Sequence, residues 1–129
     1  MINLPGNLFY SETHEWVQLE PDNIVSVGIT DFAQQALGKV TYIELPGVGQ
    51  QLARGDACAV LESAKVVCDV RSPVTGEVVS VNELLAADCT ALNGEPYLAW
   101  LIRIRAAAIA ETATLLDAGA YRALLAEAA

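Results

Sequence analysis

A single lysine stands at the expected tip of a β-hairpin. Apolar, β-prone runs at residues 57–61 and 66–70 are bounded by turn signals, and Ala64 and Lys65 form the loop between them. Two-residue hairpin loops favour glycine or asparagine because the chain adopts positive φ there, and this loop has neither. Most exposed lysines are simple solvated charges. This loop nevertheless departs from the usual turn preference next to an exposed, reactive amine, and such a departure indicates a functional role for Lys65.

Catalysis by the chain's own side chains has little support in the sequence. The single histidine, His14, stands beside Trp16, with no serine or cysteine at a spacing that indicates a nucleophile. No pair of carboxylates is singled out, and the glycines form neither a phosphate-binding loop nor a dinucleotide fingerprint. We therefore expect no catalytic residues, and any chemistry would belong to a group carried on Lys65.

The cysteines indicate neither metal binding nor disulfides. Cys58, Cys68 and Cys89 are odd in number and lack C-x-x-C spacing. With a two-residue hairpin loop, the register places Leu61 opposite Cys68 and Cys58 opposite Arg71. We expect all three cysteines to be small apolar core residues, and we expect no metal site.

Composition narrows the classes of protein further. A chain of 129 residues that is 53% hydrophobic is sufficient for one core, so we expect a single domain over residues 1–129. Sixteen acidic residues against 7 basic ones give a net charge of -9, which argues against nucleic acid as a partner. The start has no targeting signal, and no run of 18 apolar residues follows. We expect a soluble cytoplasmic protein with no membrane partner.

The elements that must position Lys65 are mostly short strands. Thr30 is placed to cap a short helix over residues 31–37, which Gly38 would end. Alternation and β-branched residues between glycine and proline turns predict strands at residues 9–10, 15–19, 24–29, 39–45, 57–61, 66–70, 77–82 and 97–104. This pattern favours a mainly β sandwich or barrel, with its core at about residues 8–105.

Helical segments are expected mainly in the last part of the chain. Residues 83–88 fit one helical turn, and residues 93–96 fit a loop. From residue 106 the chain is rich in alanine, with leucines and Tyr121 at helical spacing and Gly119 between them. We expect one helix or two short ones over about residues 108–127, packed on the sheet over an apolar edge.

Several motifs together resemble one family, the glycine cleavage system H protein. The hairpin sequence Glu62-Ser63-Ala64-Lys65, the following Asp69 and the turn at residues 72–78 look like the lipoyl-attachment hairpin of that family. Further matches in the same order and spacing lie at residues 13–16, 27–33, 36–38, 44–49 and 55–56. The resemblance covers about residues 8–125, and it implies a barrel-sandwich hybrid, the lipoyl-domain fold, with short helices and a C-terminal helix.

The resemblance also implies a function. Lys65 would carry lipoate as an amide, and the chain would be a carrier subunit without catalytic activity of its own. The lipoyl arm would take an aminomethyl group from glycine decarboxylase (P protein) to the folate-dependent aminomethyltransferase (T protein), and dihydrolipoamide dehydrogenase (L protein) would reoxidise it. A lipoate-attaching enzyme would be a further partner. By motif position, the cleft that receives the arm would contain Thr13, Glu15, Ile29 and Asp69.

Departures from the family pattern leave alternatives open. Val66, Val67 and Cys68 replace two small residues and a serine, residues 97–100 lack the usual glycines, and residues 86–90 replace an acidic, proline-bearing stretch. The alternative functions are an H-like carrier that relays lipoate to other proteins or serves another lipoyl pathway, and an unmodified interaction domain. A biotin carrier fits less well, because that family's hairpin resembles Ala-Met-Lys-Met. We expect a monomer.

Overall fold

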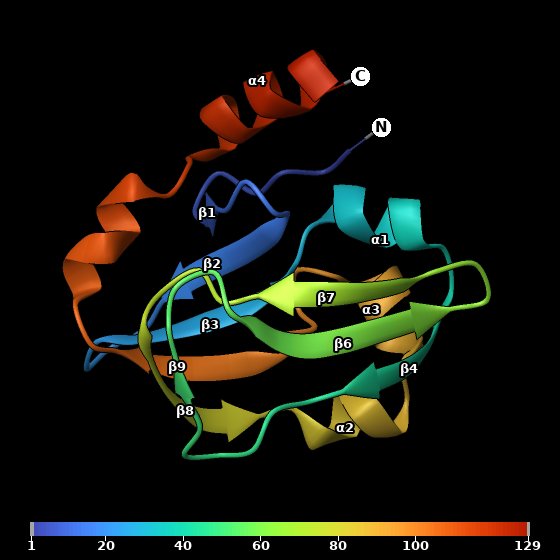
Figure 1. Ribbon diagram of the computed structural model, residues 1–129. Coiled ribbons are helices and arrows are strands. Elements are labelled where there is room, and N and C mark those ends of the chain that lie inside the picture. Colours follow the sequence, from blue (N-terminus) through green and yellow to red (C-terminus); the bar gives the residue numbers. More distant parts are fainter. Residues whose placement is uncertain (1, 129) are drawn as a thin grey trace.

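The computed structural model describes residues 2–128, which form two antiparallel sheets with short helices around them (Figure 1). The larger sheet has the strand order β1-β2-β3-β9-β8-β5, and the smaller has the order β4-β6-β7. The strands are β1 (Phe9–Tyr10), β2 (Glu15–Leu19), β3 (Ile24–Ile29), β4 (Val40–Glu44), β5 (Gln51–Leu52), β6 (Ala57–Ser63), β7 (Val67–Arg71), β8 (Gly76–Val81) and β9 (Ile102–Ala106). The expected mainly β, barrel-sandwich class is confirmed.

Strands β2 and β3 form a tight hairpin, and the ends of these strands form one wall of the candidate functional site. Asp22 and Asn23, with φ of 63° and 61°, make the turn between them, and such short polar residues tolerate this conformation. The register pairs Glu15 with Ile29, so two predicted cleft residues stand side by side at the end of the hairpin.

Helix α1 (Asp31–Leu37) follows β3 directly, as expected. The Thr30 hydroxyl accepts a hydrogen bond from Ala33 N–H, which satisfies one of the free donors of the first turn. Gly38 ends the helix with φ 77°, a conformation that glycine adopts without strain. The helix therefore begins and ends where the sequence predicts.

The β6–β7 hairpin projects beyond the rest of the fold, beside α1 (Figure 1). Leu61 pairs with Cys68, and Ser63 N–H bonds to Val66 C=O, so the loop has two residues, as predicted. Arg71, however, pairs with Ala57 and not with Cys58, because a bulge lies between residues 57 and 59. A bulge inserts one unpaired residue, which register counting from the loop cannot detect.

The stretch before β9 differs most from the expectation. The predicted strand over residues 97–104 is correct only at residues 102–104, because β9 covers Ile102–Ala106 and Tyr97 lies in a turn. The expected helical turn is α2 (Glu83–Ala87), whereas α3 (Thr90–Gly94) was not predicted and takes up part of the expected loop. Trp100 stands in phase with Ile102, and that alternation extended the predicted strand too far toward the N-terminus.

The C-terminal segment forms two short helices, one of the predicted outcomes. The 3-10 helix η1 covers Ile109–Thr114, and α4 covers Ala118–Ala128. An isolated bridge joins Leu116 to Tyr10, so this segment covers the edge of the larger sheet at β1. No helix in the described residues is long and apolar enough to cross a membrane.

Buried side chains gather in two clusters. The main cluster fills the space between the sheets. The second lies between α4, β1 and the N-terminal segment, which run close together in Figure 1, and its buried members are Leu4, Leu8, Tyr10, Trp16 and Tyr121. The second cluster fixes α4 against the same region of the chain that bears Glu15.

Candidate functional site

Lys65 lies at the exposed tip of the β6–β7 hairpin. Neither Ala64 nor Lys65 has a positive φ, so this loop does not need the glycine or asparagine that two-residue loops usually have. The Ser63 hydroxyl instead accepts from the N–H groups of Lys65 and Val66, both at 3.3 Å. A serine side chain that bonds to the next backbone amides stabilises a tight turn without glycine.

The outer end of the Lys65 side chain lies close to Gly38 at the end of α1. A Cβ atom on Gly38 would be 3.2 Å from Lys65 Cε, tighter than nearly all real contacts. The loop bearing Gly38 is held by Asn93 of α3, whose amide donates to Gly38 C=O at 2.8 Å and to Gln34 Oε1 at 2.9 Å. Asn93 Oδ1 also accepts from Val40 N–H at 2.9 Å. The sequence did not reveal this role, because the three partners are 53 to 59 residues away along the chain.

A groove of about 320 Å³ lies between α1, the β6–β7 hairpin and the ends of β2 and β3. All four predicted cleft residues line it, although they come from three separate parts of the chain. The remaining lining residues are mostly apolar: His14, Phe32, Ala33, Ala36, Leu37, Leu61, Val66, Val67, Cys68 and Val70. Such walls suit an aliphatic arm, and the few polar groups would fix its end.

Glu15 is the buried polar group of the groove, with only 2% of its surface exposed. Its Oε1 accepts from the hydroxyls of Ser11, at 2.5 Å, and Thr13, and its Oε2 accepts from Arg71 N–H at 3.1 Å. Burial raises the pKa of Glu15, and these hydrogen bonds oppose the shift. Thr13 and Glu15 therefore act together, since the threonine orients the carboxylate that it contacts.

Asp69 of β7 and Ile29 of β3 both line the groove. The Asp69 side chain is 47% exposed and pairs with the Arg71 guanidinium at 3.5 Å. Solvent screens a pair of this kind, so Asp69 attracts a cation more weakly than a buried carboxylate does. Ile29 is buried, and it pairs with Glu15 across the β2–β3 hairpin.

Cys68 also lines the groove, which corrects the prediction that all three cysteines are core residues. Cys58 is buried, Cys89 is partly buried, and Cys68 is exposed. Burial raises the pKa of the Cys68 thiol, and the carboxylates of Glu15 and Asp69 raise it further. The thiol therefore stays protonated at neutral pH. The described residues contain no group of three potential ligands that could hold a metal ion.

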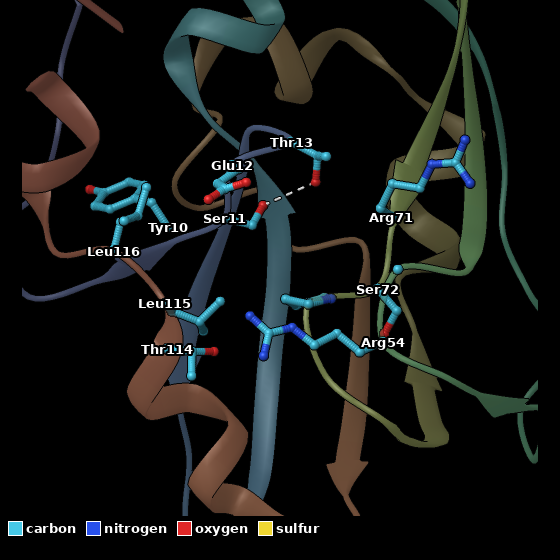
Figure 2. A pocket seen from close by; sticks show the side chains of 12 residues that line it. Tyr10, Ser11, Glu12, Thr13, Arg54, Arg71, Ser72, Thr114, Leu115 and Leu116 are labelled. Atoms are coloured by element: carbon cyan, nitrogen blue, oxygen red, sulfur yellow. Dashed lines mark hydrogen bonds between the residues drawn. The ribbon is translucent and has the colours of Figure 1, made fainter. Parts of the chain in front are cut away.

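A second cavity, of about 370 Å³, is lined in part by the turn that carries Ser11 and Thr13 (Figure 2). The two hydroxyls of this turn lie 3.3 Å apart. Figure 2 shows Arg54 reaching toward Thr114 across this cavity. Of the predicted site residues it contains only Thr13, which lines both hollows, so Thr13 forms part of the wall between them.

The fold and the site define the class of protein. Two sheets in a lipoyl-domain arrangement display one lysine on a hairpin tip, above an apolar groove with a buried carboxylate. Such a domain holds a carried group in place and leaves the chemistry to that group.

Comparisons with known proteins identify the family. The family model "Glycine cleavage H-protein" matches residues 8–128. The chain is 50% identical to a glycine cleavage system H protein of Methylococcus capsulatus, covering 98% of this chain and 100% of that protein. A glycine cleavage system H protein 2 of Pseudomonas syringae pv. tomato is 48% identical, with the same coverage of both chains. The crystal structure of a glycine cleavage system H protein from Mycobacterium marinum matches with a TM-score of 0.88 and 33% identity, covering 95% of this chain and 99% of that one. The chain belongs to the glycine cleavage H-protein family.

Proposed function

We propose that this protein carries a lipoyl group on Lys65 and shuttles an aminomethyl group in glycine cleavage. The observation that carries the proposal is that the exposed Lys65 directly precedes Val66 and Val67, which line a groove that also contains the buried carboxylate of Glu15. Family membership supports a lipoyl cofactor. The position of Lys65 in the family motif supports that residue as the attachment point.

The residues present fit a lipoyl arm. When bound, this group supplies a reactive dithiolane that accepts the aminomethyl group and later gives it up. The groove's buried apolar walls, such as Leu37, Leu61 and Val70, exclude water from the arm. Glu15 offers a buried carboxylate to a protonated amine, and Asp69 adds a second negative charge nearer the solvent.

The turn at the hairpin tip gives the arm its starting direction. The Ser63 hydroxyl fixes the backbone amides of Lys65 and Val66, and Gly38 leaves room for the outer atoms of the lysine side chain. Asn93 holds the Gly38 loop in place. A stable base with a free outer end allows the arm to swing between the groove and partner enzymes.

The partners in this proposal are the other components of glycine cleavage. These are glycine decarboxylase, the aminomethyltransferase and dihydrolipoamide dehydrogenase, together with a lipoate-attaching enzyme. The protein would act in the cytoplasm as a monomer. Its net charge of -9 favours partner surfaces that carry basic side chains.

Attachment and loading test the proposal in two steps. Incubation with a lipoate ligase should add one lipoyl mass to the wild type and to Lys39→Arg, which removes the other lysine, but not to Lys65→Arg. Purified glycine decarboxylase with glycine should then load the modified wild type. A lipoyl increment on Lys65→Arg would refute the attachment site. Lipoylated protein that the decarboxylase fails to load would instead support a relay of lipoate to other proteins.

A further inference from the structure

A chain of hydrogen bonds connects the groove with the C-terminal helix. His14 lines the groove, and its Nδ1 lies 2.8 Å from the Tyr121 hydroxyl of α4. The same hydroxyl lies 2.8 Å from Thr30 Oγ1, at the start of α1. These hydrogen bonds therefore link Tyr121 to two residues that precede it by 91 and 107 positions, and they reach the groove at the His14 imidazole.

The positions of the hydrogens follow from the burial of Thr30. Its side chain is fully buried, and Oγ1 already accepts from Ala33 N–H. Within residues 2–128, the other hydrogen-bond partner of Oγ1 is the Tyr121 hydroxyl, so the buried threonine hydrogen is satisfied only when it is donated there. Tyr121 then donates its own hydrogen to His14 Nδ1. An uncharged imidazole that accepts at Nδ1 carries its proton on Nε2.

We propose that Tyr121 is a positioning residue for the arm groove. Its hydroxyl holds the His14 imidazole uncharged, with the imidazole proton on Nε2. This inference rests on the proposed function, because the tautomer of His14 affects the cargo only if the groove receives a cationic group. In this tautomer Nε2 is a donor, and it does not compete with the carboxylate of Glu15 for a protonated amine. Glu15 and Asp69 then remain the groove's acceptors for that amine.

The surroundings of His14 keep the imidazole in place. His14 has φ 74°, which is uncommon for a residue other than glycine, and both its backbone groups are bonded, to Ser11 and Thr30. Its ring packs on Phe32, with 4.7 Å between the ring centroids. Strained backbone persists where the structure holds it on several sides, and such positions are concentrated at functional sites.

The tyrosine ring is held independently of its hydroxyl. Tyr121 is fully buried and stacks on Tyr10, with 4.9 Å between the centroids and 9° between the ring planes. Asp117 caps α4 by accepting from Ala120 N–H at 2.8 Å. Tyr121→Phe therefore removes the donor to His14 and leaves the packing in place.

NMR of the imidazole tests the proposal directly, because the chain contains one histidine and its signals need no assignment. Long-range nitrogen–proton correlations on histidine-labelled, unmodified protein at neutral pH should show the proton on Nε2 alone. Tyr121→Phe should give a mixture of both tautomers. On the lipoylated protein, the same variant should shorten the lifetime of the aminomethyl cargo by about 2- to 12-fold, the range of one ordinary hydrogen bond.

Two control variants distinguish positioning from general damage. Tyr10→Phe removes a neighbouring hydroxyl that donates to Pro5 C=O, and it should leave the tautomer unchanged. Thr30→Ser keeps the hydroxyl donor, and it should also keep the proton on Nε2. A proton on Nδ1 in the wild type, or an unchanged tautomer in a folded Tyr121→Phe, would overturn the inference. Failure of Lys65 to accept lipoate would refute the proposed function and leave the NMR result standing.

Discussion

Glu15→Gln gives the sharpest test of how the groove holds its cargo. An ionised carboxylate has about four lone-pair positions. Ser11 and Thr13 occupy Oε1, and Arg71 N–H occupies one position on Oε2, which leaves one position on Oε2 for a cationic donor. A hydrogen bond to a charged group contributes about 1.5–3 kcal/mol. Since about 1.4 kcal/mol is tenfold in rate, Glu15→Gln should release the cargo about 12- to 140-fold faster.

The assay measures release of formaldehyde and ammonia from the loaded, lipoylated protein without the folate enzyme. Lipoylation of Lys65 itself should proceed at the normal rate in Glu15→Gln, because the carboxylate lies inside the groove. Glu12→Gln is a matched control, because Glu12 is exposed and lines only the second cavity. Asp69→Asn should change release by at most about fivefold, the upper range for an exposed charge. An unchanged lifetime in Glu15→Gln would refute the view that a buried carboxylate holds the cargo.

Three further predictions concern the parts that surround the groove. Asn93→Ala should lower the free energy of unfolding by about 1–3 kcal/mol in urea titration, because it leaves backbone partners unsatisfied, and should slow lipoylation; an effect as small as that of Thr90→Ala on the same helix would contradict this role. One alanine inserted before Lys65 should sharply reduce lipoylation by a ligase, whereas the same insertion after Gly47 should not; normal labelling would mean that the ligase reads only local sequence. Burial lowers the pKa of His14 below its ordinary 6.5, so its contribution to stability is present above pH 6.5 and is lost as the pH falls through the lowered value. His14→Asn, which tolerates the positive φ, should remove that part of the pH dependence, and identical pH profiles of wild type and variant would refute it.

Local signals predicted the elements of the fold well. The cap at Thr30, the end of α1 at Gly38 and the pairing of Leu61 with Cys68 all follow from residues within a few positions of one another. The bulge beside Cys58 could not be predicted in this way, because an unpaired residue leaves the apolar pattern intact. The shift of β9 has a similar cause, since alternation continues past the point where pairing begins.

The groove could be predicted only in part, and the reason is distance along the chain. The family motif named Thr13, Glu15, Ile29 and Asp69, and the structure places all four around one hollow. Motif matching attaches a role to each residue separately, so it missed contacts made between elements. Asn93 reaches Gly38 across 55 residues, and Tyr121 reaches His14 across 107. Neither contact leaves a periodic or compositional pattern in the sequence.

The groove contains two titratable groups, the buried Glu15 and the partly buried His14, and the pKa of each is displaced in the direction that favours its uncharged form. Burial raises the pKa of Glu15 and lowers that of His14. A raised carboxyl pKa means that the contribution of Glu15 to stability is present at low pH and is lost as the pH rises through the raised value, so its ionised form weakens the fold at neutral pH. Ser11, Thr13 and Arg71 offset this cost with hydrogen bonds to the carboxylate, and a bound cation would offset more of it. A positive charge in the groove would therefore stabilise the ionised carboxylate, which fits the proposed role of a carrier that holds a cationic cargo and lets it leave when the arm swings out.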